Sequence, residues 1–370
     1  MRRLLWCVCL MATASFADDE PSQLAGLLGA DDQRGFARAI EPRRFVFPDD
    51  HGPHPAFRNE WWYVTGNLDD DRGRRFGFEL TIFRFALLPG TDASSDGWQT
   101  GQVYIAHFAI TDPQDGRFLV AEKSSRGAAG LAGARSVPFA VWLDDWSIAE
   151  DGNVWRLKAS SDEIAIDVVL DALKPPVLNG DAGLSQKSSE PGNASYYYTI
   201  SRLATSGSLR IADETFSVSG ESWLDREWST SALSGEQVGW DWFALQLDDN
   251  TELMFYSLRF KDGTQDPSSA GTFIAADGSS IKLAASDVEL TVTDTWKSPA
   301  GGRYPAAWTI AVPAMGLNLT VTPVMADQEL FTIVRYWEGA VDISGTRFGD
   351  PVDGRGYVEL TGYADNDGEP

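Results

Sequence analysis

The sequence of 370 residues contains only two cysteines and three histidines. Both cysteines, Cys7 and Cys9, fall within residues 1–17, which have a basic start, a short apolar run and small residues at cleavage spacing. These features are typical of a secretory signal peptide. Its removal leaves a chain with neither disulfide bonds nor a thiolate nucleophile. We therefore expect a periplasmic or secreted protein.

Long apolar runs are also missing. No segment after residue 17 approaches the roughly 18 apolar residues of a membrane-spanning helix, so no transmembrane segment is expected in the mature chain. The glycine-rich nucleotide fingerprints and the G-x-S-x-G elbow of serine hydrolases are absent as well. The histidines and cysteines form no metal-ligand cluster. We expect neither a metal nor a cofactor.

Positive charge is scarce, because 30 Lys and Arg residues stand against 54 Asp and Glu residues and give a net charge of −24. Such a surface repels phosphate backbones and anionic headgroups, so nucleic acid is not an expected partner. An apolar small molecule or lipid is the partner that the rest of the sequence favours, and a membrane transporter is left open as a second.

From Phe45 onward the chain is rich in short β-forming segments separated by Gly and Asp turns, without the periodicity of long amphipathic helices. The same order of motifs occurs twice. A ring-rich strand, an acidic turn and a strand ending in Arg-Phe read "WWYVTGNLDD…FELTIFRF" and, later, "WDWFALQLDD…LMFYSLRF".

The repeat predicts an all-β protein made of two antiparallel lipocalin-like (calycin) barrels in tandem. We expect the signal peptide at 1–17, an N-terminal extension at 18–44, one barrel at 45–230 and the second at 238–365. The fold alone does not establish ligand binding, because side chains fill many small barrels.

The stretch "NEWWYVTGNL" places a carboxylate, Glu60, beside Trp61, Trp62 and Tyr63. Strand alternation sends Trp61 and Tyr63 to one face and Glu60 and Trp62 to the other. Two interpretations remain open: an ordinary strand, or a pocket wall in which the acid has a pKa raised by desolvation.

A denser constellation is "GESWLDREWSTS", in which Asp225 and Arg226 lie between Trp223 and Trp228. A buried Asp225 needs a donor or becomes protonated. An Asp–Arg clamp at the junction of the barrels and a catalytic acid are equally good interpretations.

Three further features complete the candidate set. "WDWF" repeats the acid among rings with Trp240, Asp241 and Trp242, either as ligand contacts or as tryptophans that plug a barrel end. His107 is alone in its strand, where a structural role is the commoner one. Residues 174–202 form a loop with compact turns that predicts a folded lid, followed by tyrosines that include Tyr197.

Taken together, "HGPHPAFRNEWWYVTGNL", "KPPVLNGD", "NASYYYTISR", "ESWLDREWSTS" and "YWEGAVDISG" resemble the AttH-type, lipocalin-like proteins of the carotenoid 1,2-hydratase (CrtC) superfamily, from about His51 to Tyr363. The resemblance implies two calycin-like barrels and acid-catalysed addition of water to a carbon–carbon double bond. In the family motif G-x-G-Y-H-D-H-N-W, Asp225 and Trp228 match, whereas the two histidines do not.

The resulting hypothesis is an exported protein that binds an apolar, isoprenoid or lipid-like ligand. It acts either as a metal-free hydratase or, without catalysis, as a periplasmic lipid carrier or chaperone; a secreted hydrolase of unknown mechanism is a further alternative. The candidate catalytic residues are Asp225, Glu60, His107 and Arg226. The candidate ligand-binding residues are Trp61, Trp62, Tyr63, Tyr197, Trp223, Trp228, Trp240, Asp241 and Trp242.

Overall fold

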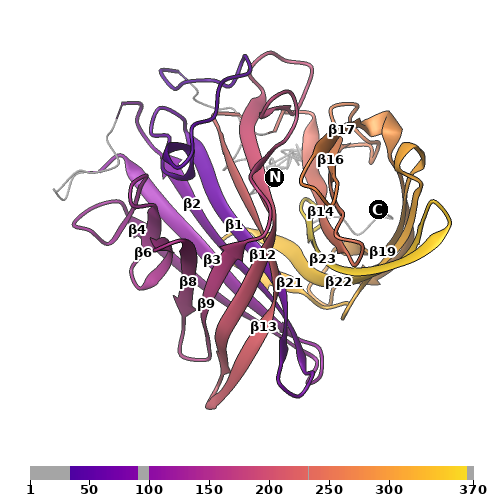
Figure 1. Cartoon of the computed structure of the whole chain (residues 1–370). Coiled ribbons are helices and arrows are strands. Elements are labelled where there is room, and N and C mark those ends of the chain that lie inside the picture. Colours follow the sequence, from indigo (N-terminus) through magenta and orange to yellow (C-terminus); the bar gives the residue numbers. More distant parts are fainter. Residues whose placement is uncertain (1–33, 91–99, 232, 365–370) are drawn as a thin grey trace, which may run out of the picture.

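The computed structural model describes residues 34–90, 100–231 and 233–364, which form two curled antiparallel sheets that lie side by side (Figure 1). The predicted signal peptide, 1–17, lies outside the described residues, and of the predicted extension at 18–44 only 34–44 is described. Among the described residues, no helix is long and apolar enough to cross a membrane.

Within the described residues, the first sheet has thirteen strands. In chain order they are β1 (Asn59–Asp70), β2 (Arg75–Ala86), β3 (Gln102–Asp112), β4 (Arg117–Arg126), β5 (Ala132–Arg135), β6 (Ala140–Leu143), β7 (Trp146–Asp151), β8 (Val154–Ser160), β9 (Ile164–Ala172), β10 (Val177–Leu178), β11 (Leu184–Gln186), β12 (Ala194–Ile211) and β13 (Glu214–Ser229).

The second sheet has ten strands in the part of the chain that the structure describes. They are β14 (Gln237–Leu247), β15 (Glu252–Phe260), β16 (Ala270–Ile274), β17 (Ser280–Ala284), β18 (Glu289–Lys297), β19 (Arg303–Val312), β20 (Leu317–Pro323), β21 (Glu329–Phe331), β22 (Arg335–Arg347) and β23 (Asp350–Leu360). The helices of the described chain are three single 3-10 turns, η1 (Asp49–His51), η2 (Ala285–Asp287) and η3 (Pro313–Met315).

The two sheets repeat one strand order. The first runs β4-β3-β2-β1-β13-β12-β9-β8, and the second runs β17-β16-β15-β14-β23-β22-β20-β19. The strands β1 to β4 therefore correspond to β14 to β17, and the hairpin β12–β13 corresponds to β22–β23. The motif repeat seen in the sequence is a repeat of topology, and the predicted pair of tandem antiparallel barrels is confirmed.

Each sheet curls around its own apolar core. In the first, β6 contacts β2, β3 and β4 and so brings the far end of the sheet back across its beginning. Its interior holds alternate residues of each strand, such as Trp62, Val64 and Leu224, all buried. A separate core that includes Phe243, Trp308 and Val358 fills the second barrel. The remaining alternate residues face outward, and on one side they face the other barrel.

A third buried cluster joins the barrels, with Tyr63, Trp223 and Trp242 among its members. The approach is close at Gly77 of β2, where a Cβ atom would lie 2.7 Å from the Cβ of Ala340 on β22. Any side chain at Gly77 would therefore push the two sheets apart and open the space between them.

A buried ion cluster fastens the first barrel from within. Glu60 is fully buried and forms ion pairs with Arg84 of β2 and Arg226 of β13. Arg226 also donates to the carbonyl of Gly52 at 2.6 Å and lies over the Trp62 ring at 3.9 Å. Burial alone would raise the pKa of Glu60, but the two guanidinium groups hold it well below its usual range.

Replacing Glu60 with Gln should therefore destabilise the protein by about 3–5 kcal/mol, because Arg84 and Arg226 would keep their charges in an interior without a counter-ion. Urea unfolding followed by tryptophan fluorescence measures the change. Glu289→Gln, an exposed position on β18, is the matched control and should change the free energy of unfolding by less than about 0.5 kcal/mol. A Glu60→Gln protein as stable as this control would contradict the structural role.

Candidate active site between the barrels

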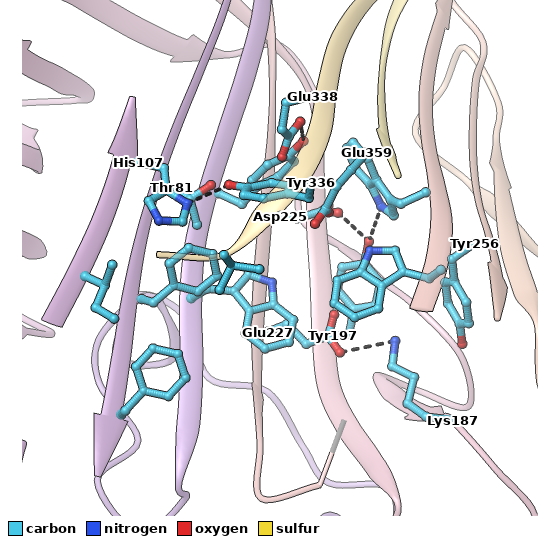
Figure 2. A pocket seen from close by; sticks show the side chains of 18 of the residues that line it. Thr81, His107, Lys187, Tyr197, Asp225, Glu227, Tyr256, Tyr336, Glu338 and Glu359 are labelled. Atoms are coloured by element: carbon cyan, nitrogen blue, oxygen red, sulfur yellow. Dashed lines mark hydrogen bonds and ion pairs between the residues drawn. The ribbon is translucent and has the colours of Figure 1, made fainter. Parts of the chain in front are cut away.

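A pocket with an open volume of about 1010 Å³, mouth included, lies between the outward faces of the two sheets and not inside either barrel. The first sheet contributes side chains from β1, β2, β3, β12 and β13, and the second contributes them from β14, β15, β22 and β23 (Figure 2). Rings and aliphatic groups dominate its lining, with a few titratable groups among them.

Strand register builds one wall. His107, Thr81, Tyr63 and Asp225 are direct neighbours across β3, β2, β1 and β13, so their side chains stand on one face in a single row. The next row on that face carries Phe83, Trp61 and Glu227. Because side chains alternate along each strand, the residues between these rows point into the barrel core.

Asp225 is the central polar group of the wall. Its side chain is buried and accepts hydrogen bonds from the hydroxyl of Tyr197, from Thr199 Oγ1 at 2.5 Å and from Trp223 Nε1 at 2.8 Å. No salt bridge of the described chain includes Asp225. Burial raises the pKa of this carboxyl to about 7, although the three hydrogen bonds oppose the shift. Asp225 therefore carries a proton at mildly acidic pH.

Lys187 and Glu227 form the charged pair of the pocket, with Lys187 Nζ 3.1 Å from Glu227 Oε1. Lys187 precedes β12 in the segment predicted as a lid. Its ammonium lies 4.0 Å from the centre of the Tyr256 ring. Burial would lower the pKa of Lys187, but Glu227 and its neighbours raise it overall.

Two further carboxyls come from the second barrel. Glu338 of β22 is fully buried and accepts a hydrogen bond of 2.8 Å from the Tyr63 hydroxyl. Glu359 is its register partner on β23. Burial raises the pKa of Glu359 to about 8, against a hydrogen bond with Trp240, and raises the pKa of Glu338 well above its usual range.

His107 is held between the barrels at the far end of the row. Its Nδ1 lies 2.6 Å from the hydroxyl of Tyr336, and its Nε2 lies 3.2 Å from Glu122 Oε2. Glu122 in turn accepts the backbone N–H of Ile333 at 2.7 Å and so fixes the rim of the pocket.

The structure brings most of the candidate residues together at this pocket. The lining includes Asp225, His107, Trp61, Tyr63, Tyr197, Trp240 and Trp242. Trp223 lies behind the lining and supports Asp225 through its indole N–H.

Five candidates lie elsewhere, and for these the placement corrects the sequence analysis. Glu60, Arg226, Trp62 and Trp228 face the interior of the first barrel. Asp241 faces the second barrel, where it pairs with Arg259 and accepts from the Tyr363 hydroxyl at 3.0 Å. Of the two interpretations left open for Asp225, the clamp with Arg226 is wrong, because neighbours on a strand point to opposite faces.

Sequence reasoning missed Lys187, Glu338, Glu359 and Tyr336. The sequence pattern could have marked the two glutamates as buried acids. Each interrupts an apolar strand, Glu338 in "RYWEGAV" and Glu359 in "GYVEL", as Glu60 does in its own strand. Lys187 had none, because a lysine in a polar loop is ordinary.

Comparison with known proteins agrees with this architecture. The model of the AttH-like family matches residues 38–363. The chain belongs to the AttH-like family.

Solved structures show the same fold. A putative AttH from Nitrosomonas europaea superimposes with a TM-score of 0.79 at 34% identity, covering 89% of this chain and all of that one. Kievitone hydratase from Nectria haematococca gives a TM-score of 0.65 at 17% identity, covering 90% of this chain and 98% of its own.

A curated relative is the dehydratase asqC of Emericella nidulans, which is 22% identical over 222 residues. The alignment covers 55% of this chain and 60% of the fungal protein, so the chain spans less than two thirds of that relative.

The raised pKa of Asp225 makes stability depend on pH. The folded state binds the proton more tightly than the unfolded chain, whose Asp has a pKa near 3.8. The protonated Asp225 carboxyl contributes its full stabilisation below about pH 3.8, and this stabilisation is lost as the pH rises to about 7.

The free energy of unfolding of Asp225→Asn, relative to that of the natural protein, should therefore be higher at pH 8 than at pH 4. The difference should be up to about 4 kcal/mol, at 1.36 kcal/mol per pKa unit. Denaturant unfolding of both proteins at the two pH values measures the difference, and other titrating groups cancel in the comparison. A difference that is the same at both values would show that Asp225 has no raised pKa.

Proposed function

We propose that this AttH-like protein adds water to a carbon–carbon double bond, or removes it in reverse, in an apolar ligand held between the barrels. Asp225 is the general acid. The observation that carries the proposal is a buried carboxyl on the wall of a ring-lined pocket, without a cation to hold it ionised. A carboxylic acid with a pKa near the working pH is an efficient proton donor.

In the forward direction, the Asp225 carboxyl gives its proton to one alkene carbon, and a cation forms on the neighbouring carbon. A water molecule bonds to that carbon, and one of its protons passes to the Asp225 carboxylate, which restores the acid. The rings of Trp61, Trp240 and Trp242 exclude bulk water and present their electron-rich faces to the cation.

The hydratase and dehydratase among the similar proteins support this class of reaction. The alternative is a carrier that binds an apolar ligand and leaves it unchanged, which the apolar lining would also serve.

We further propose that the protein works in the periplasm or outside the cell, as residues 1–17 suggest. Mass spectrometry of protein recovered from the periplasm checks this, and an intact residue 1 would contradict it.

The test incubates the purified protein with linear isoprenoid alkenes such as geraniol, farnesol and squalene. Liquid chromatography with mass spectrometry then seeks products that are heavier by one water. Asp225→Asn should lose about 100-fold or more in turnover with its fold intact, because it keeps the shape of the side chain and lacks the proton. Activity of the natural protein should also fall as the pH rises above about 7.

Asp213→Asn, at the exposed turn between β12 and β13, is the matched control and should keep full activity. If Asp225→Asn is as active as this control, the assignment of the acid is wrong. If none of the alkenes is converted but one is recovered bound and unchanged, the carrier is the better description.

A further inference from the structure

The described lining of the pocket carries four carboxyl groups and one cation. The carboxyls are those of Asp225, Glu227, Glu338 and Glu359, and the cation is Lys187. Only Glu227 among the four pairs with that cation. The other three face the same space without an ion-pair partner in the described chain, and burial raises the pKa of each of them.

Lys187 shows what these surroundings do to a cation. Its ammonium contacts the Glu227 carboxylate at 3.1 Å and lies 4.0 Å and 5.2 Å from the centres of the Tyr256 and Tyr197 rings. Burial would normally favour the neutral amine, yet Glu227 first, and then Tyr256 and Asp225, raise the pKa of this lysine overall. A cation is therefore stable between rings and carboxyls in this wall.

The neighbouring part of the pocket repeats that combination and holds no side-chain cation among the described residues. Its rings include Trp61, Trp240 and Trp242. Its carboxyls are Asp225, Glu338 and Glu359 (Figure 2). Glu338 is fully buried, and its Oε1 has no hydrogen-bond partner in the described structure, whereas its Oε2 accepts from Tyr63. An unpartnered buried carboxyl oxygen on a pocket wall marks a place where a ligand completes the site.

We propose that this part of the pocket is a binding site for an organic cation, namely an ammonium group with apolar substituents. The inference goes beyond the proposed function, because it names a ligand class and holds whether or not the ligand is then hydrated. The ammonium lies among the indole faces and beside Asp225, Glu338 and Glu359. Its apolar substituent extends along Phe83, Phe85 and Ile105 toward the rim at Ile333.

Two interactions give the cation its advantage over a neutral group of equal shape. The faces of tryptophan rings attract a cation, and they do so more strongly where water is excluded. A permanent charge also stabilises the ionised form of Glu359, whose proton then leaves for solvent. A hydrocarbon of the same shape is stabilised in the pocket only by burial of its apolar surface, and the ammonium compound has this contribution as well.

The test measures binding of two isosteric probes by titration of tryptophan fluorescence at about 150 mM salt, which screens the acidic surface. The probes are benzyltrimethylammonium and neopentylbenzene, in which carbon replaces the nitrogen. The cation should bind at least about 10-fold more tightly than the hydrocarbon, since cation–π contacts and ionised carboxylates both favour it. Equal affinity for the two probes would overturn the proposal.

Variants locate the site. Glu359→Gln should weaken binding of benzyltrimethylammonium about 3-fold to 10-fold, because the amide cannot ionise beside the charge, and should leave the affinity for neopentylbenzene within about twofold. Glu289→Gln makes the same change on the exposed face of β18 and should alter neither affinity. A Glu359→Gln protein that binds the cation as tightly as Glu289→Gln does would place the cation on the surface and contradict the inference.

The outcome is independent of the hydration assay. Tight and selective binding of the cation, with no conversion of any alkene, would support the cation site and reject the hydratase. Conversion of an alkene, with equal affinity for the two probes, would do the reverse.

Discussion

The structure depends on the alternation of side chains along β13, which separates two neighbours in sequence, Asp225 and Arg226. Arg226 points into the first barrel and, with Arg84, neutralises Glu60. Asp225 points out of it, toward the second barrel, and has hydrogen-bond donors but no cation beside it. Arg226 therefore stabilises the fold, whereas the Asp225 carboxyl, one residue before it, is available for proton transfer in the pocket.

The same alternation explains why the pocket lies between the barrels. The interior of each barrel is occupied by a core of buried side chains. The outward faces of β1, β13, β14 and β23 carry rings and acids instead, and they become buried only because the second sheet packs against the first. Gly77 allows that approach, and Tyr63 of the first barrel reaches Glu338 of the second across it. Neither barrel alone makes the site.

Much of this was predictable, because it follows from local periodicity. The alternation in "NEWWYVTGNL" correctly separated Trp61 and Tyr63 from Glu60 and Trp62, and the repeated motif order predicted the repeated topology. The partners of Glu60 were not predictable, because Arg226 is 166 residues away in the chain and only the sheet register brings it close. For the same reason the sequence showed acids beside rings at Glu60, Asp225 and Asp241 without showing which of them faces a barrel interior. Glu338 and Glu359 each stand out locally as an acid in an apolar strand, but only the packing of one barrel on the other brings them to the pocket that Asp225 lines.

Asp225 retains its proton to near neutral pH because its carboxyl is buried without a counter-ion. Difference infrared spectroscopy of the free protein over a pH series measures this directly, with Asp225→Asn to assign the carboxyl band. We expect a band that is lost with a midpoint near pH 7 and is absent from the variant. A midpoint near the ordinary value of 3.8 would contradict it, because Asp225 would then be an ionised structural group and not a proton donor.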